Sequence, residues 1–109
     1  MTFQKPYVII DHTKANLLYE SKANISDGSI MEIVIWQLPS ITKERAHGLK
    51  YRLNYSLPNG ACLIRYDNKA GKGDHKHILT EEKPYIFKTL GQLLFDFYSD
   101  IIANGGLIE

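Results

Sequence analysis

The thirteen residues from Arg65 to His77 hold the side chains best suited to chemistry. They include a guanidinium, an amide, two carboxylates and two imidazoles: Arg65, Asn68, Asp67, Asp74, His75 and His77. Successive side chains of a strand point to opposite faces, so Arg65 and Asp67 share a face if residues 61–68 form a strand. His75 and His77 share a face by the same rule. A cation, a carboxylate and two groups that titrate near neutral pH would then converge, which suits a site acting on phosphate.

The two histidines predict acid–base chemistry. A pair of imidazoles supplies both a proton acceptor and a proton donor, and RNA cleavage by a 2′-hydroxyl needs both. Arg65 is the best candidate for holding the scissile phosphate, because its planar guanidinium matches phosphate oxygens. Asp67 would orient one histidine, and Asn68 would hydrogen-bond the substrate or the backbone. The competing interpretation is two exposed loop histidines and a surface Arg–Asp pair worth under about 1 kcal/mol.

A metal site is the second chemical interpretation of the same residues. His75 and His77, with Asp67 or Asp74 as a third ligand, would form a two-histidine, one-carboxylate site. Zinc-binding patterns usually offer more ligands at tighter spacing, so we predict a metal-independent site with no cofactor. A metal-dependent hydrolase remains the alternative. The glycine-bearing segment 71–73 would let backbone amides approach a phosphate, although it lacks the P-loop spacing.

Charge is unevenly distributed along the chain. The net charge is +1, but residues 43–77 carry eight basic and three acidic side chains, a balance of +5, whereas residues 1–42 and 78–109 are acidic. A basic surface attracts the phosphate backbone of nucleic acids. The side chains predicted to follow an RNA backbone are Lys50, Arg52, Lys69, Lys72 and Lys76, together with Asn68. The simpler interpretation is a solvated sheet face of mixed charge.

Length and composition predict a single domain spanning residues 1–109. The hydrophobic content of 44% and the charged content of 23% are those of an ordinary soluble protein. The single cysteine, Cys62, cannot form an internal disulfide, which fits a reducing compartment. No signal peptide or membrane span is recognisable, so we expect a cytoplasmic protein that does not bind membranes.

Alternating apolar residues predict strands that would position the site. Residues 49–57 alternate apolar and polar side chains, and a Pro-Asn-Gly turn at 58–60 leads into the return strand 61–68. Residues 17–26 and 29–38 flank an Asp-Gly turn and form a second hairpin, in which the apolar run 31–38 indicates a central strand covered on both faces. Residues 75–79 indicate a short fifth strand, and residues 85–87 a further strand or a loop. Cys62 falls on the apolar face of its strand and is expected in the core.

The C-terminal segment predicts a helix that packs on the sheet. Thr89 and Gln92 form a capping box, and Asn104 with two following glycines ends the helix. One apolar stripe runs along it: Leu90, Leu93, Leu94, Phe97 and Ile101. The polar segment 39–47 is a short helix or a loop. The predicted fold is therefore α+β, an antiparallel sheet of about five strands with a C-terminal helix on one face.

The pattern resembles the TumE family, small toxin components of bacterial and archaeal toxin–antitoxin pairs. The specific part is the Arg-Tyr-Asp-Asn run at 65–68 followed by His75 and His77, and the resemblance extends over roughly residues 15–103. Family members often carry a third histidine beside the pair, where this chain has Ile78. The resemblance implies a toxin with a helix-turn-helix antitoxin as its partner. By analogy with small toxins of this kind, we expect it to act on RNA, as a ribonuclease or by blocking translation.

Three other interpretations stay open. The basic face could bind nucleic acid or a protein without catalysis, or the metal-dependent hydrolase could hold. The chain could also serve as a structural partner in a homodimer, with the apolar strand 31–38 at the dimer edge. His12 and His47 stand apart from the other candidates and are assigned no chemical role.

Overall fold

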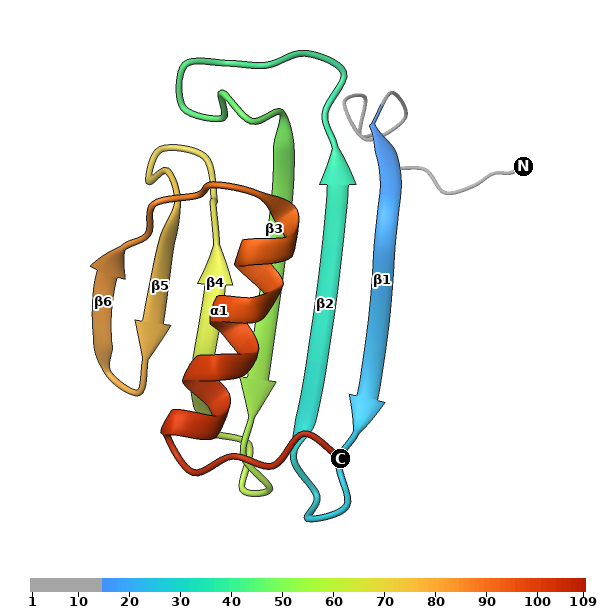
Figure 1. The fold of residues 1–109 in the computed structure, drawn as a ribbon, viewed down its shortest axis with the longest axis vertical. Coiled ribbons are helices and arrows are strands. Elements are labelled where there is room, and N and C mark those ends of the chain that lie inside the picture. Colours follow the sequence, from blue (N-terminus) through green and yellow to red (C-terminus); the bar gives the residue numbers. More distant parts are fainter. Residues whose placement is uncertain (1–14) are drawn as a thin grey trace.

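Six strands form one antiparallel sheet in the computed structural model, which describes residues 15–109 (Figure 1). Each strand pairs with its neighbours in sequence, so the order across the sheet is β1-β2-β3-β4-β5-β6. The strands are β1 (Asn16–Asn24), β2 (Ile30–Gln37), β3 (Leu49–Ser56), β4 (Cys62–Asp67), β5 (His75–Ile78) and β6 (Glu81–Pro84). The α+β class is confirmed. His12 lies outside the described residues.

The strand β6 was not predicted, so the estimate of about five strands is wrong by one. All four of its residues are exposed, and its sequence is charged and ends in Pro84, which suits an edge strand but hides the apolar alternation used to recognise strands. The turn before it also lacks the glycine that usually takes a positive φ, because Leu79 occupies that position with a φ of 57°. Residues 85–87 follow β6 and lie outside the strands.

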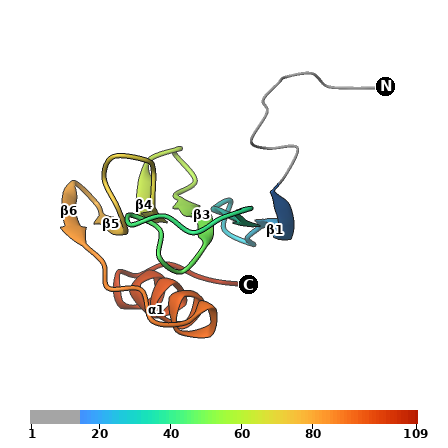
Figure 2. The same ribbon diagram turned by 90° about the horizontal axis from the view of Figure 1, so that it is seen from above.

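The helix α1 (Leu90–Ala103) covers one face of the sheet, as Figure 2 shows from above. The Thr89 hydroxyl accepts a hydrogen bond from the Gln92 amide at 3.0 Å, which confirms the N-cap. The Gln92 side chain instead donates to Asp96 at 2.7 Å, so the reciprocal half of the predicted capping box is not formed. Leu93, Phe97 and Ile101 are buried, which confirms the predicted stripe.

The core lies between α1 and one face of the central strands. Tyr51, Leu53 and Tyr55 of β3 and Tyr66 of β4 are buried there, and the Tyr66 ring meets Phe97 edge to face at 5.9 Å. The alternate residues of β3 and β4 must therefore point to the other face. No helix in the part of the chain that the structure describes covers that second face.

Three sequence predictions about the sheet are wrong. The strand β2 is central, but residues 15–109 cover only one of its faces; Val34 and Trp36 on the other face are half-buried. Because β2 lies between β1 and β3, it cannot serve as a dimer edge. A register shift between Tyr55 and Ser56 places Cys62 beside Asn54 on the uncovered face, with Sγ 3.4 Å from Asn54 Oδ1, rather than in the core.

The connection from β2 to β3 contains turns and no helix. Its turn is held by the Arg45 amide, which donates to the Thr42 hydroxyl at 3.0 Å. No helix in the described residues has the length and apolar character needed to span a membrane.

Candidate active site

The uncovered face of the sheet carries two rows of polar side chains that run across β3, β4 and β5. In one row Arg52 is the cross-strand partner of Asp67, and Asp67 is the cross-strand partner of His75. In the next row Arg65 is paired with His77. Cross-strand partners lie about 5 Å apart and contact each other through their side chains. The structure therefore brings together the guanidinium, the carboxylate and the two imidazoles that the spacing singled out.

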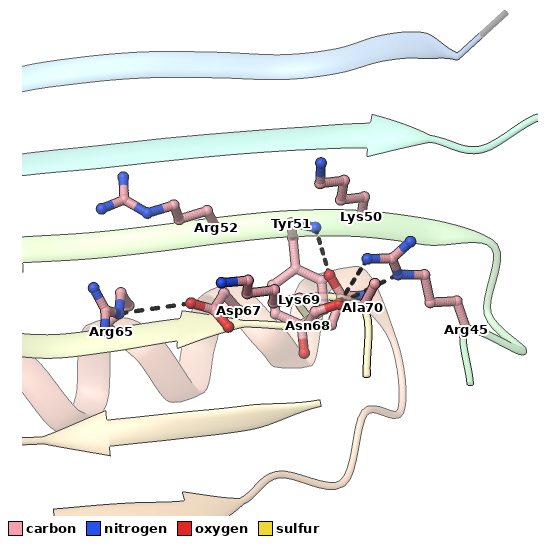
Figure 3. A pocket seen from close by; sticks show the side chains of 9 residues that line it. All are labelled: Arg45, Lys50, Tyr51, Arg52, Arg65, Asp67, Asn68, Lys69 and Ala70. Atoms are coloured by element: carbon pink, nitrogen blue, oxygen red, sulfur yellow. Dashed lines mark hydrogen bonds and ion pairs between the residues drawn. The ribbon is translucent and has the colours of Figure 1, made fainter. Parts of the chain in front are cut away.

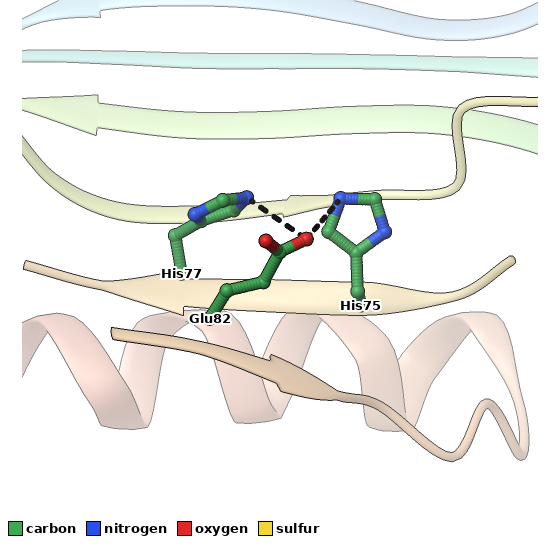
Figure 4. A group of neighbouring side chains, drawn as sticks. All are labelled: His75, His77 and Glu82. Atoms are coloured by element: carbon green, nitrogen blue, oxygen red, sulfur yellow. Dashed lines mark ion pairs between the residues drawn. The ribbon is translucent and has the colours of Figure 1, made fainter. Parts of the chain in front are cut away.

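Glu82 of β6 extends the second row, because it is the partner of His77. Its carboxylate lies between the two imidazole rings, as Figure 4 shows. Glu82 Oε2 is 3.6 Å from His75 Nε2 and 3.7 Å from His77 Nε2. We call His75, His77, Glu82 and Asp67 the histidine–carboxylate cluster.

His75 is nearly enclosed, with only 7% of its side chain exposed. Its Nδ1 lies 2.9 Å from the Gly73 carbonyl, which can only accept, so this nitrogen carries the proton. Nε2 lies 2.8 Å from Asp67 Oδ1. Asp67 Oδ1 is nevertheless buried without a hydrogen bond of normal geometry from any residue that the structure describes. Its negative charge is thus only partly matched.

A basic hollow of about 500 Å³ adjoins this cluster (Figure 3). Its cations are Arg45, Lys50, Arg52, Arg65 and Lys69, and Asp67 is the one carboxylate in its lining. Lys50 and Arg52 project from β3, whereas Arg65 and Asp67 project from β4. Arg65 Nε is 3.6 Å from Asp67 Oδ2 and is buried without a hydrogen-bond partner among the described residues. The excess of positive charge makes the hollow suitable for an anion such as phosphate.

Asn68 takes part in the structure of the sheet. It is fully buried; its side chain accepts a hydrogen bond from the Tyr51 amide at 3.0 Å and donates to the Leu49 carbonyl at 2.7 Å. Its own carbonyl accepts hydrogen bonds from Arg45 Nε and Nη2 at 3.2 and 3.0 Å. These contacts leave Asn68 little to offer a ligand and support the backbone role among the two that the sequence suggested.

Two of the predicted RNA-binding lysines, Lys72 and Lys76, lie outside the basic hollow. Lys76 points to the helix face, where Nζ is 3.1 Å from Asp100 and 5.5 Å from the centre of the Tyr66 ring. It is thus separated by the sheet from His75 and His77. Lys72 lies beside the histidine–carboxylate cluster, where Nζ donates to Glu82 Oε2 at 3.1 Å. The Gly71 amide donates to Glu44 at 2.9 Å, so it is not directed at a phosphate.

His47 does not stand apart, as the sequence suggested. Its Nδ1 accepts a hydrogen bond from the Leu49 amide at 3.1 Å, so Nε2 carries the proton and faces Asp74 at 3.0 Å. Tyr51 also donates to Asp74 at 2.7 Å. Asp74 is therefore used in a brace between two loops and β3, and His47 has no free lone pair with which to act as a base.

Burial and hydrogen bonding to carboxylates keep the hydroxyl groups of three tyrosines protonated. Burial, reinforced by hydrogen bonds from Tyr51 to Asp74 and from Tyr66 to Asp100, raises the pKa of both phenols well above the ordinary value. Burial and a hydrogen bond to Asp96 raise the pKa of Tyr85 in the same way. Burial also raises the pKa of Cys62 despite the opposing charges of Arg65 and Arg52, so the thiol is a poor nucleophile at neutral pH.

Sequence reasoning missed Arg45 and Glu82. A short strand at 75–79 followed by a charged segment ending in proline is typical of an edge hairpin, and that signal would have placed Glu82 opposite His77. No local signal identifies Arg45, because a connection between distant strands brings it to Asn68.

Comparison with known proteins gives one family. The family model for toxin TumE matches residues 8–104. Neither the curated proteins nor the solved structures yield a match. The match confirms the family resemblance inferred from the sequence. Because it covers most of the chain, the chain belongs to the TumE family and is a toxin component of a toxin–antitoxin system.

Proposed function

We propose that this toxin cleaves RNA at a metal-independent site on the uncovered face of the sheet. The observation that carries the proposal is the pair of rows in which Asp67 is the partner of His75 and Arg65 the partner of His77. Proton-transfer groups and a phosphate-binding cation lie side by side there, next to the basic hollow.

The chemistry is transfer of the phosphate to the neighbouring 2′-hydroxyl. One imidazole accepts the 2′-hydroxyl proton, the 2′-oxygen attacks phosphorus, and the bond from phosphorus to the 5′-oxygen breaks. The other imidazole, protonated, gives its proton to the departing 5′-oxygen. Arg65 offsets the charge that develops on the phosphate oxygens, and Asp67 orients His75. The products are a 2′,3′-cyclic phosphate and a 5′-hydroxyl.

RNA binding is assigned to the basic hollow and its surroundings. Lys50, Arg52 and Lys69 hold the strand on either side of Arg65, and Lys72 lies at the far side of the cluster. Such contacts attract any phosphate backbone, so they supply affinity without sequence selection.

The partner is an antitoxin, as the family implies. We further propose that this antitoxin carries a helix-turn-helix domain and that the toxin acts in the cytoplasm. Co-expression with the product of the adjacent gene tests the partnership with the antitoxin: rescue of growth and a stable complex on gel filtration are expected.

Purified, tag-free protein incubated with RNA in the presence of a chelator tests the cleavage. We expect products with cyclic phosphate ends, and a rate lowered by about 100-fold or more in His77→Gln and Arg65→Gln. The controls are Glu81→Gln and Lys88→Gln, two exposed residues outside the hollow and the cluster. Variants at His77 and Arg65 that fold and remain fully active would refute the site.

A second candidate is a toxin that blocks translation by binding RNA without cutting it. The low exposure of His75 favours it, because an imidazole that is 93% buried has little room to touch a substrate. Salt-dependent RNA binding without any cleavage product would support this candidate over the ribonuclease.

A further inference from the structure

We propose that His75, His77 and Glu82 form a binding site for a divalent first-row transition-metal ion, with Zn²⁺ as the representative, and that the bound ion blocks the proposed cleavage. The binding site stands on geometry alone. The blocking effect rests on the proposed function.

The Glu82 carboxylate oxygen is already close to the required distance from each imidazole. One ligand atom from each of the three residues lies within 4.8 Å of the other two. Glu82 Oε2 is 3.6 and 3.7 Å from the two Nε2 atoms. A tetrahedral zinc site with bonds of about 2.0–2.1 Å holds its ligand atoms about 3.3 Å apart. The carboxylate therefore needs to move by only a few tenths of an ångström relative to each ring.

The surroundings of His75 are those of a metal ligand. Its Nδ1 faces the Gly73 carbonyl at 2.9 Å, which fixes a proton there, so an ion would bind at Nε2 in place of any proton held between Nε2 and Asp67. Metal-binding histidines commonly donate their other ring nitrogen to a backbone carbonyl in this way. Asp67 Oδ1, 2.8 Å from Nε2, is buried and lacks a hydrogen bond from the described residues. A cation at Nε2 would match that uncompensated charge.

The choice of metal follows from the ligands. Two imidazoles and one carboxylate suit Zn²⁺ and its neighbours, whereas Mg²⁺ and Ca²⁺ prefer oxygen ligands throughout. Access is open, because Glu82 is exposed and borders a second hollow of about 340 Å³ that Lys72 and His75 also line. Three protein ligands leave a fourth position for water.

Lys72 is the internal competitor for this site. Its ammonium group donates to Glu82 Oε2 at 3.1 Å, the same oxygen that a metal ion would take. Removing this charge should therefore strengthen metal binding. This prediction has the opposite sign from that expected if Lys72 merely held a structural glutamate in place.

Metal binding and the proposed proton transfer exclude each other. The lone pairs of His75 and His77 that would accept a proton are the ones that would coordinate the ion. A toxin with Zn²⁺ bound would thus keep its RNA-binding cations and lose its acid–base pair.

Isothermal titration of tag-free protein with ZnCl₂ tests the site without reference to activity. We expect one ion per chain in the wild type, an affinity at least about tenfold lower in Glu82→Gln and His77→Gln, and a higher affinity in Lys72→Gln. Glu81→Gln is the matched control, because Glu81 is the exposed neighbour that pairs with Lys83. Binding that is undiminished in Glu82→Gln, or no binding in the wild type, would overturn the site.

RNA cleavage assays with the same proteins then test the blocking effect. Inhibition of the wild type by one equivalent of Zn²⁺, with resistance in Glu82→Gln, supports it. Cleavage that requires Zn²⁺ would overturn both the blocking effect and the metal-independent mechanism, while the titration would still uphold the site. Protein without cleavage under any condition refutes the proposed function alone, and the site is then judged by titration.

Discussion

Replacing Asn68 by alanine should destabilise the fold and leave RNA binding intact. The Asn68 side chain is fully buried and hydrogen-bonds the Tyr51 amide and the Leu49 carbonyl of β3. Alanine would leave both backbone groups without these partners. A buried polar group without a partner costs about 1–3 kcal/mol, and the adjoining hollow admits some water, so we expect a total loss of about 3 kcal/mol. At about 4 °C per kcal/mol, the melting temperature should fall by about 12 °C.

Thermal and urea unfolding followed by circular dichroism would measure this loss. Asn24→Ala is the matched control, because Asn24 is exposed at the end of β1 and should change stability by less than about 0.5 kcal/mol. Affinity of Asn68→Ala for RNA, measured well below its melting temperature, should equal that of the wild type. A variant with unchanged stability and weakened RNA binding would show that Asn68 contacts the ligand and that its bonds to β3 do not stabilise the sheet.

Three further predictions follow from the core and the basic hollow. If Lys50 and Arg52 contact phosphates, their double alanine variant should lower the slope of log affinity against log salt by about 0.7 per lost contact, measured by fluorescence anisotropy; an unchanged slope would place the RNA elsewhere. Gly106→Ala should cost about 1–3 kcal/mol in urea unfolding, because the new Cβ would lie 2.6 Å from Ile101 Cγ2 and 3.1 Å from the Tyr55 ring. Gly91→Ala should be neutral or slightly stabilising, because apart from the adjacent helix backbone nothing lies within 4 Å of its new Cβ; equal effects of the two would contradict this packing. Burial raises the pKa of Tyr51, Tyr66 and Tyr85 above the ordinary 10.0, so the folded state holds these protons more tightly than the unfolded state. The contribution of these phenols to stability should therefore be constant below about pH 10 and fall as the pH rises further. Tyrosinate absorbance from these three phenols should appear together with unfolding, and their ionisation in folded protein near pH 10 would refute the assignment.

Local patterns in the sequence determined most of the elements. The alternation along β3, the turns after β1 and β3, the apolar stripe of α1 and its Thr89 cap are all readable within a few residues, because side-chain period and capping are local properties. The same period placed Arg65 with Asp67 and His75 with His77 on common faces. The family was recognisable for the same reason, since the residues on which the resemblance was based lie in two short runs.

Only the tertiary structure decided which of these residues meet. Pairing of β4 with β5 sets His77 against Arg65, and the unpredicted strand β6 brings Glu82 to the two histidines. A shift of one residue reverses the face of a side chain, so the irregularity at Ser56 moved Cys62 out of the core. Register and irregularities of this kind are set by pairing between strands, and a single strand's sequence does not contain them.

Long-range hydrogen bonds account for the remaining differences. Asn68 was a candidate ligand by its type and position, yet β3 takes up both ends of its amide. Lys76 belonged to the basic segment, but strand alternation directs it to Asp100 on α1. The sequence by itself thus determined most of the elements, the family and the residue types available for chemistry. The fold decided which of these groups remain free, because hydrogen bonds between distant segments use the others to hold the sheet and the helix together.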